Sequence, residues 1–218
     1  MLYAKNAQGV AISQANYRVY TKRFNKYGRQ PSGIYWSDNE RQCSRFKIIL
    51  DQVAAIIPQG SVSIADVGCG YGALADYLRN SGDSDHVRYH YTGYDINPML
   101  ISACRGTHGI PAAQFKLGDC PTETVDFSVM SGTYNMAVTR DVAHWESYIL
   151  GCLSACWRYS NRGMVFNLLA SDNAYISEGM LYHSNIHSIR RYCRANFGHT
   201  RIIRDPRLPS DATLVVSR

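Results

Sequence analysis

Residues 64–72 read Ile-Ala-Asp-Val-Gly-Cys-Gly-Tyr-Gly, and this stretch is more informative than the rest of the chain. Two apolar residues run into Asp66, after which Gly68, Gly70 and Gly72 alternate with other residues. The pattern predicts a buried strand that ends in a tight turn and opens a helix. Glycine is needed there because a Cβ atom would block the turn or the close approach of a ligand to the backbone. The stretch is therefore typical of a loop that binds a nucleotide or a related molecule.

A dinucleotide is the first candidate ligand for that loop. Residues 68–73 satisfy the spacing G-x-G-x-x-G/A, and Asp95 follows at the end of the next predicted strand. Three features argue against a nicotinamide cofactor. Asp66 would set a negative charge against a pyrophosphate. None of the five lysines has a tyrosine four positions before it, and 218 residues leave little room for a separate catalytic domain.

Three further segments continue the pattern in order. They are His-Tyr-Thr-Gly-Tyr-Asp-Ile-Asn-Pro at 90–98, Phe-Lys-Leu-Gly-Asp-Cys at 115–120 and Asp-Phe-Ser-Val-Met-Ser-Gly-Thr at 126–133. With the glycine loop, they resemble the motifs of the class I (Rossmann-like) S-adenosylmethionine-dependent methyltransferases. The resemblance extends from about residue 60 to the end of the chain, and four ordered motifs are more specific than one glycine loop.

The resemblance implies which residues bind the cofactor. The acid after the second strand, here Asp95, would bind both ribose hydroxyls, and the acid after the third, here Asp119, would meet the adenine amino group. S-adenosylmethionine also carries a sulfonium and an ammonium, which Asp66 would favour, and a carboxylate, which backbone N–H groups of the loop can face. The predicted cofactor-binding residues are Asp66, Gly68, Cys69, Gly70, Gly72, Asp95, Ile96, Asn97, Asp119, Cys120, Ser131 and Gly132. Taken singly, Asp95 and Asp119 are also typical helix N-caps.

Length and composition place the chain among soluble globular proteins of one ordinary domain. It has 218 residues, of which 45% are hydrophobic and 18% charged. No stretch approaches the roughly 18 apolar residues of a membrane span, and the start of the sequence does not resemble a signal peptide. We therefore expect a cytoplasmic protein. The seven cysteines are odd in number and scattered, which favours reduced thiols, and we expect no metal site.

The net charge of +6 is unevenly distributed along the chain. Residues 61–135 hold eight acids against four Lys and Arg, whereas residues 1–60 and 136–218 are both basic. The acidic part contains the cofactor motifs, as expected for a site that takes a sulfonium. The basic parts favour an acidic substrate or a nucleic acid. A solvated basic surface is the alternative, because no Lys/Arg run exceeds two residues.

Alternating strands and helices predict a doubly wound α/β sheet that is mostly parallel, with helices on both faces. The resemblance implies seven strands with an antiparallel edge strand. Residues 1–58 are expected to form an N-terminal helical lid, with helices over 13–27 and 38–57, and residues 59–218 the Rossmann-like core. A helix over 141–159, closed by Gly163, should precede a buried strand over 163–170 and a terminal hairpin.

The methyl acceptor should lie at the ends of the fourth and fifth strands, beside the cofactor. His183 is the candidate general base because its unperturbed pKa lies near neutrality, and Asn135 is the second predicted catalytic residue. The predicted substrate-binding residues are Tyr27, Trp36, Tyr134, Asn167 and Tyr182. Each has a plainer interpretation, as a surface histidine, a strand-end hydrogen bond or aromatic packing. Arg41 or Arg45 is a further candidate to reach the cofactor carboxylate or an acidic acceptor.

These patterns predict an S-adenosylmethionine-dependent methyltransferase acting at O or N of a small metabolite. Segments 131–135, 166–167 and 181–183 resemble a bacterial subgroup tied to polysaccharide or secondary metabolism, hence a secondary-metabolite or sugar-like acceptor. An RNA or protein methyltransferase is the first alternative, although the chain lacks a long basic stripe. A regulator that binds the cofactor without turnover is the second. We expect no membrane partner, and a homodimer is compatible with the sequence.

Overall fold

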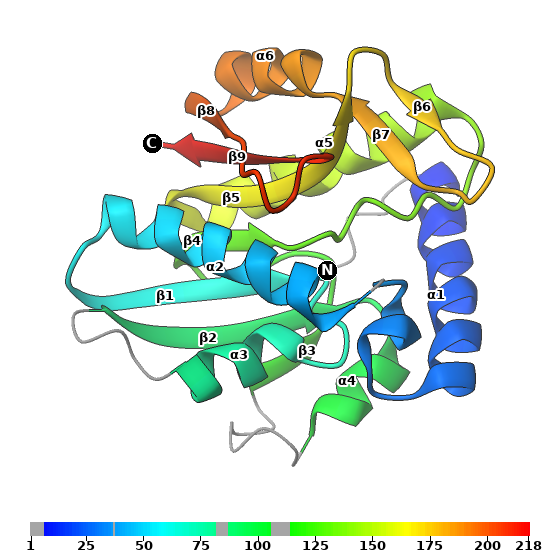
Figure 1. Ribbon diagram of the computed structural model, residues 1–218, viewed down its shortest axis with the longest axis horizontal. Coiled ribbons are helices and arrows are strands. Elements are labelled where there is room, and N and C mark those ends of the chain that lie inside the picture. The colour runs from blue at the N-terminus through cyan, green and yellow to red at the C-terminus, as the bar shows by residue number, and fades with distance from the viewer. Residues whose placement is uncertain (1–6, 37, 82–86, 106–113) are drawn as a thin grey trace.

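One twisted sheet runs through the molecule and carries helices on both faces (Figure 1). The computed structural model describes residues 7–36, 38–81, 87–105 and 114–218. Its strands are β1 (Gly60–Val67), β2 (Val87–Asp95), β3 (Phe115–Leu117), β4 (Val125–Met130), β5 (Ser160–Ser171), β6 (Tyr175–Ile176), β7 (Tyr182–Asn185), β8 (His199–Ile203) and β9 (Asp211–Ser217). Its helices are α1 (Ala7–Tyr27), the 3-10 helix η1 (Pro31–Ile34), α2 (Asn39–Ile56), α3 (Ala73–Ser81), α4 (Pro98–Cys104), α5 (Val142–Tyr159) and α6 (Ile186–Asn196).

Five strands are parallel and lie in the order β3-β2-β1-β4-β5. From β1 the chain adds β2 and β3 on one side, and then returns to add β4 and β5 on the other side of β1. Beyond β5 the sheet divides. β9 pairs antiparallel with residues 163–169 of β5 and carries β8 at its other side, while β7 pairs with residues 169–171 and carries β6. The predicted class, a mostly parallel doubly wound sheet with a reversed strand near its edge, is confirmed.

The described residues form nine strands, not the seven that the resemblance implied. The two additional strands are β6 and β7, which make an antiparallel pair of two and four residues. Strands this short leave little periodic signal in a sequence. They continue the sheet past the end of β9, over the carboxyl end of β5.

Capping residues fix several helix starts. The side chain of Asp38 accepts a hydrogen bond from the Arg41 N–H at 2.7 Å, and Asp141 accepts one from the His144 N–H at 3.0 Å. Both predicted starts are confirmed. The N-cap before Pro98 is Asn97, so Asp95 remains available for another role.

The prediction that Gly163 closes α5 was wrong. The C-cap is Ser160, and β5 begins there. A Cβ atom on Gly163 would lie 2.1 Å from the carbonyl oxygen of Val216. Glycine is therefore required because β9 approaches β5 closely, and not because a helix ends at this position.

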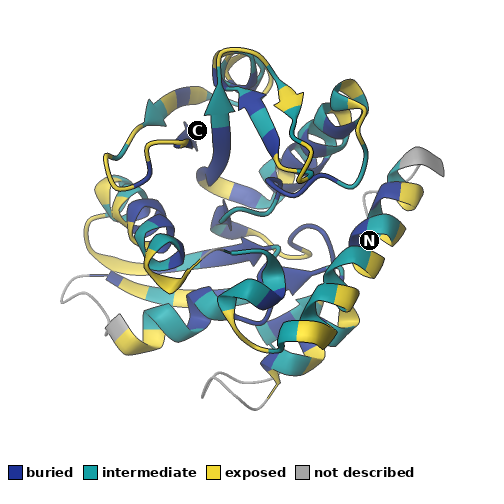
Figure 2. Ribbon diagram, turned by 45° about the vertical axis from the view of Figure 1, so that its right-hand side comes forward, coloured by how far each residue is buried: buried dark blue, intermediate teal, exposed yellow. Residues whose placement is uncertain are grey.

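Two apolar clusters cover the two faces of the sheet. One joins β1 and β2 to α2, α3 and α4, and includes Phe46, Ile49 and Ile101. The other joins β4, β5 and β9 to α5 and α6, and includes Trp145 and Ile189. Figure 2 shows buried residues along the strands and exposed residues on the outward sides of the helices. No helix in the described part of the chain is long and apolar enough to cross a membrane.

Residues 7–36, hereafter the lid segment, contain α1 and η1 and lie across the end of the sheet where β1 and β2 terminate (Figure 1). Ile12 anchors α1 in the second apolar cluster. The Asn97 Nδ2 donates to Thr21 Oγ1 at 3.0 Å, which joins α1 to the loop after β2. By contrast, α2 belongs to a helical layer on the sheet, because Phe46, Ile49 and Val53 are buried against the strands.

Candidate active site

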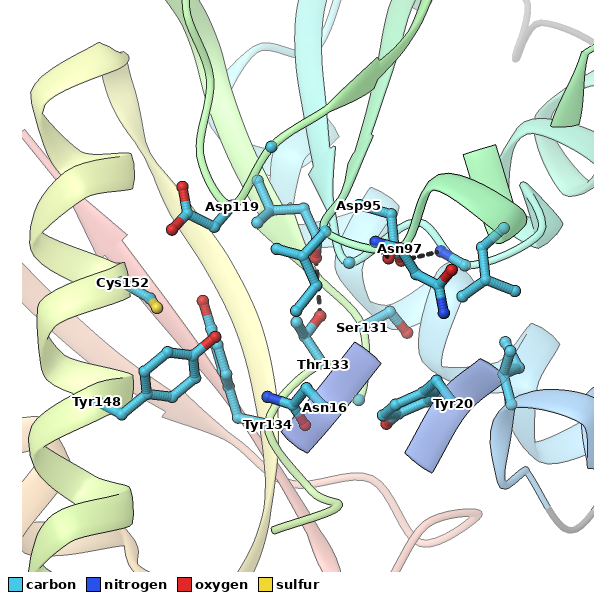
Figure 3. Close-up of a pocket in the computed structure, with 18 of the residues that line it drawn as sticks. Asn16, Tyr20, Asp95, Asn97, Asp119, Ser131, Thr133, Tyr134, Tyr148 and Cys152 are labelled. Carbon is cyan, nitrogen blue, oxygen red and sulfur yellow. Dashed lines mark hydrogen bonds between the residues drawn. The ribbon is translucent and has the colours of Figure 1, made fainter. Parts of the chain in front are cut away.

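A cavity lies between the carboxyl ends of the strands and the lid segment (Figure 3). The empty volume of the cavity is about 760 Å³, which includes the open solvent at its mouth. The lining residues come from the ends of β1 to β4 and from α1, η1, α4 and α5. They are Asn16, Tyr20, Ile34, Trp36, Val67, Gly68, Gly70, Asp95, Ile96, Asn97, Leu100, Gly118, Asp119, Ser131, Gly132, Thr133, Tyr134, Tyr148 and Cys152. This is the place where doubly wound sheets bind ligands.

The glycine loop after β1 forms one wall of the cavity, and its glycines serve two purposes. Gly68 has φ of 77° and Gly70 has φ of 58°, a region that other residues rarely adopt. A Cβ atom on Gly68 would also lie 2.4 Å from Thr133 Cγ2. The loop thus lies directly against the loop after β4, and Thr133 Oγ1 donates to the Val67 carbonyl at 2.8 Å.

The backbone N–H groups of the glycine loop donate hydrogen bonds to other atoms of the protein. Gly68 and Cys69 donate to the Tyr94 carbonyl at 2.7 and 2.9 Å, and Gly72 donates to the Cys69 carbonyl at 3.0 Å. Gly70 donates to Asp95 Oδ2 at 2.9 Å. In this arrangement these four N–H groups are not directed at a ligand carboxylate, so the loop contributes shape and close approach.

Asp95, at the end of β2, is the most firmly held polar group in the lining. Its Oδ2 accepts from Gly70 N–H and its Oδ1 accepts from Asn97 N–H at 2.8 Å. Burial raises its pKa to about 6 although these backbone hydrogen bonds oppose the shift. Each carboxylate oxygen has a second lone pair, so Asp95 can still accept hydrogen bonds from a ligand.

Asp66 lies beneath the cavity and not in its lining. The Tyr91 hydroxyl donates to Asp66 Oδ2 at 2.9 Å, and Asp66 is 3% exposed. Burial raises the pKa of Asp66 to about 7; the Tyr91 hydrogen bond lowers it, and the charge of Asp95 raises it further. Asp66 and its partner Tyr91 therefore both lie outside the cavity lining.

The far end of the cavity is formed by Asp119, after β3, together with Tyr134, Tyr148 and Cys152. Figure 3 places these four side chains on the side of the cavity opposite Tyr20 and Asn97. Burial, with a contribution from Asp119, raises the pKa values of Tyr134, Tyr148 and Cys152. These hydroxyl and thiol groups therefore remain protonated near neutral pH and serve as hydrogen-bond donors.

Two buried polar atoms of the lining have no hydrogen-bond partner among the described residues. They are Ser131 Oγ and the Tyr134 hydroxyl oxygen. Buried polar groups in native proteins are nearly always paired. These two atoms and the Asp95 carboxylate fit a polar ligand that supplies both hydrogen-bond donors and acceptors.

The lid segment forms the wall opposite the strand ends. Asn16 and Tyr20, one turn apart on α1, line the cavity, as do Ile34 and Trp36. A Cβ atom on Gly70 would lie 3.1 Å from Ile34 Cδ1, and one on Gly132 would lie 2.9 Å from Trp36 Cζ2. The lid segment therefore packs directly on both glycine-containing loops.

Part of the chain matches a family of known proteins. Residues 65–166, which run from β1 into β5 and carry the glycine loop, Asp95 and Asp119, match a family described as a methyltransferase domain. Residues 65–166 are a class I methyltransferase domain. S-adenosylmethionine is the cofactor of that family, in agreement with the resemblance seen in the sequence.

Two curated methyltransferases are similar to part of this chain. A methyltransferase of Mycobacterium tuberculosis, Rv1506c, is 36% identical over 110 residues, which are 50% of this chain and 64% of the relative. The phthiotriol/phenolphthiotriol dimycocerosates methyltransferase of Mycobacterium leprae is 28% identical over 86 residues, 39% of this chain and 30% of the relative. The matched region thus spans less than two thirds of either relative.

Solved structures share the fold of the whole chain. The magnesium protoporphyrin IX methyltransferase of Synechocystis PCC 6803, with S-adenosylhomocysteine bound, aligns over 97% of this chain and 99% of its own at a TM-score of 0.61 and 13% identity. An amino pentose methyltransferase of Micromonospora echinaspora, with S-adenosylmethionine bound, aligns over 91% and 96% at a TM-score of 0.55 and 13% identity. At this identity the likeness concerns the fold alone.

Predicted site residues divide between the lining and its surroundings. The lining of the cavity contains ten of them: Gly68, Gly70, Asp95, Ile96, Asn97, Asp119, Ser131, Gly132, Tyr134 and Trp36. Outside it lie Asp66, Cys69, Gly72, Cys120, Tyr27, Asn135, Asn167, Tyr182 and His183. The roles assigned to both groups stay predictions.

The residues expected to act on the acceptor are engaged within the protein. The His183 ring stacks on Tyr175 at 4.5 Å between centroids, and burial lowers the pKa of His183. Asn135 Oδ1 accepts from Leu169 N–H at 3.1 Å, and Asn167 Oδ1 accepts from Gly132 N–H at 2.7 Å. Asn167 thus supports the loop after β4 from behind the cavity.

The remaining predicted residues are also held by neighbours. The Tyr182 hydroxyl donates to Glu146 Oε1 at 2.7 Å. The Arg23 guanidinium lies 4.2 Å from the centre of the Tyr27 ring. Arg45 does not reach the cavity, because its guanidinium pairs with Asp211 Oδ1 at 2.6 Å. Among the described lining residues there is no Lys, Arg or His.

The sequence did not indicate most of the residues that line the far end of the cavity and the wall from the lid segment. It did not assign Asn16, Tyr20, Ile34, Val67, Leu100, Gly118, Thr133, Tyr148 or Cys152 to the site. Tyr148 and Cys152 both lie on α5, and their spacing along that helix is the same whether they face the core or a cavity. None of the seven cysteines forms a disulfide, and no group of three His, Cys, Asp or Glu among the described residues is arranged to hold a metal ion.

Proposed function

We propose that this chain binds S-adenosylmethionine in the cavity and transfers its methyl group to an oxygen or nitrogen of a small molecule. The observation that carries the proposal is the row of groups at successive strand ends. The glycine loop follows β1, Asp95 follows β2 and Asp119 follows β3, and one cavity brings them together. The matched family and the ligand-bound structures of the same fold support the proposal.

The residues present suit each part of the cofactor. Asp95 would accept hydrogen bonds from the two ribose hydroxyls, and Asp119 from the adenine amino group. The Ser131 and Tyr134 hydroxyls would pair with remaining polar atoms. The buried carboxylates of Asp66 and Asp95 would favour the positively charged sulfonium over the neutral product. When bound, the sulfonium supplies an activated methyl group for in-line displacement.

The contribution of this chain to the reaction is alignment and exclusion of water. Trp36 and Tyr20 cover the strand ends, and the described lining contains no histidine to act as a general base. Holding the reacting atoms about 3–3.5 Å apart supplies much of the acceleration in such a reaction. We therefore propose an acceptor whose nucleophile reacts without a strong base, such as an amine. His183 acting from the acceptor side remains the sequence-based alternative.

The acceptor would enter beside the loop after β4. With no cationic side chain in the described lining, the cavity favours a neutral acceptor over an acidic one. The named relatives and neighbours act on a lipid, a porphyrin and an amino pentose, which supports a small-molecule or lipid acceptor for this chain as well. We keep the secondary-metabolite or sugar-like acceptor as the narrower proposal.

Calorimetry and a labelled-methyl assay would test the proposal. We expect S-adenosylhomocysteine to bind with one site per chain and NADH not to bind. Radiolabelled S-adenosylmethionine, incubated with the protein and extracts fractionated by size, should label small molecules. Binding of NADH without S-adenosylhomocysteine would refute the cofactor, and binding without any labelled product across the fractions would favour a regulator.

A second candidate, methylation of RNA, is favoured by one surface feature. A hollow on α6 is lined by His187, Arg190, Arg191 and Arg194, with Ala195. Arginines at helical spacing suit a phosphate backbone. Labelled RNA, with binding that weakens steeply as salt rises, would support this candidate, whereas label confined to small molecules would refute it.

A further inference from the structure

Trp36, at the end of the lid segment, packs on the loop after β4. It lines the cavity, and its ring lies against Gly132, where a Cβ atom would approach Cζ2 to 2.9 Å. Gly132 follows β4, the strand end at which the acceptor is expected. The position of the Trp36 ring therefore decides how wide the cavity is beside the reacting groups.

The Trp36 ring is covered by a guanidinium group from another element. The Arg45 Cζ lies 4.4 Å from the centre of the ring. Arg45 belongs to α2, which packs on the face of the sheet. A planar guanidinium stacks on an aromatic ring in a way that a lysine ammonium cannot reproduce.

Arg45 is itself fixed by a carboxylate far away in the sequence. Its Nε donates to Asp211 Oδ1 at 2.8 Å and its Nη2 lies 2.6 Å from the same oxygen. Both residues are buried, at 8% and 3% exposure. Asp211 is the first residue of β9 and pairs with Leu169 of β5. The sheet thus holds Asp211, Asp211 holds Arg45, and Arg45 covers Trp36.

A buried ion pair is weak evidence for stability, because desolvation of the two charges offsets their attraction. Retention of such a pair is better explained when it fixes the position of a neighbour. We propose that Arg45 and Asp211 are positioning residues that hold Trp36 against the loop after β4, and so set the width of the cavity at the methyl-transfer end. This inference rests on the proposed function of the cavity.

The chain contains a matched control for this contact. The Arg218 guanidinium lies 4.2 Å from the centre of the Trp157 ring and also bonds to the carbonyls of Ser160 and Trp157. This second Arg–Trp stack lies outside the cavity lining. Arg218→Met therefore removes the same kind of contact without touching the proposed site.

The experiment uses the 218-residue chain labelled with 5-fluorotryptophan, whose three tryptophans give three fluorine resonances. Trp36→Phe assigns the resonance of Trp36. We expect S-adenosylhomocysteine to shift this resonance in the unsubstituted protein. Arg45→Met should move the resonance without ligand and raise the dissociation constant of S-adenosylhomocysteine about 3- to 30-fold, the range for a partly desolvated cation–π contact.

Arg45→Lys separates positioning from a merely structural role. It keeps the charge that Asp211 needs but lacks the planar group over Trp36. We expect Arg45→Lys to bind S-adenosylhomocysteine as weakly as Arg45→Met, with a melting temperature nearer to that of the unsubstituted protein. Asp211→Asn should move the Trp36 resonance in the same direction, and Arg218→Met should move only that of Trp157.

Two results would overturn the inference. One is an unchanged Trp36 resonance and unchanged affinity in Arg45→Lys and Arg45→Met. The other is an equal loss of affinity in Arg218→Met. If the unsubstituted protein does not bind S-adenosylhomocysteine, the proposed function fails first, and the resonances without ligand still show whether Arg45 places Trp36.

Discussion

The two walls of the cavity are built in different ways. The wall at the strand ends consists of Gly68, Asp95 and Asp119, and backbone hydrogen bonds from neighbouring strand ends hold its best-defined member, Asp95. The wall from the lid segment consists of Asn16, Tyr20, Ile34 and Trp36, which side-chain contacts with distant elements hold in place. Local turn geometry sets the first wall and tertiary packing sets the second. Substitutions in the first wall should therefore lower stability and cofactor affinity more than substitutions in the second wall.

The largest effect is expected for Gly68→Ala. The substitution combines a left-handed backbone with a Cβ atom 2.4 Å from Thr133. We expect a loss of about 3 kcal/mol or more in the free energy of unfolding, from about 1–2 kcal/mol of backbone strain and a similar cost of overpacking. Gly60→Ala is the matched control, since Gly60 has φ of 96° but no atom within 4 Å of its Cβ position. Equal denaturant midpoints for the two variants would show that contact between the two loops is unimportant.

Asp95→Ala should come next. We expect affinity for S-adenosylhomocysteine to fall by about 1–3 kcal/mol, the scale for hydrogen bonds to a charged group. Calorimetry measures this directly. Asp126→Asn is the control, because Asp126 accepts hydrogen bonds from Ser63 and lies outside the lining. Unchanged affinity in Asp95→Ala would remove the ribose role and the main argument for the strand-end wall.

The two buried acids of the site, Asp66 and Asp95, should make the free energy of unfolding fall as pH rises. The pKa values of Asp66 and Asp95 are raised to about 7 and about 6, above the value of about 3.9 expected in an unfolded chain. Between these values the folded protein binds more protons than the unfolded chain. Their stabilising contribution is therefore complete below about pH 4 and is lost as pH rises through about 7.

Asp66→Asn tests that sign. We expect the difference in free energy of unfolding between the variant and the unsubstituted protein to change steadily from pH 5 to pH 8, in favour of the variant at high pH. Urea titrations at each pH measure it. A difference that does not change with pH would mean that Asp66 titrates normally in the folded protein.

Tyr134→Phe should have a smaller effect. It should preserve or raise the stability of the ligand-free protein but lower its affinity for S-adenosylhomocysteine. The Tyr134 hydroxyl has no partner among the described residues, so its removal should leave the ligand-free protein equally or more stable. Affinity for S-adenosylhomocysteine should fall by about 1 kcal/mol if the hydroxyl pairs with the ligand. Tyr182→Phe, which loses the bond to Glu146, should instead lower the melting temperature. A less stable Tyr134→Phe with full affinity would contradict the assignment.

His183→Ala should have the smallest effect on turnover. The ring stacks on Tyr175 outside the lining, so we expect methyl transfer to change by no more than about twofold, compared with 10²–10⁴ for loss of a general base. The measurement is labelled-methyl transfer to the acceptor found in the extract fractions. A fall of a hundredfold at unchanged cofactor affinity would restore His183 as the base.

Much of the fold was predictable because its determinants are local. The glycine loop, the apolar strands, and the caps at Asp38 and Asp141 each follow from a few neighbouring residues. The wrong assignment at Gly163 shows the limit of this approach. A glycine after a helix has the same sequence signal whether it caps the helix or admits a neighbouring strand, and only the approach of Val216 distinguishes the two.

The sequence by itself determined the strand-end wall, since parallel strands bring the residues that follow them to one edge of the sheet. Tertiary structure alone decided the lid wall, the place of Asp66 beneath the cavity and the pairing of Arg45 with Asp211, 166 residues away. The physical reason is that a turn is specified by the conformational limits of adjacent residues. A contact between distant residues exists only after the chain has packed, and no local pattern records it.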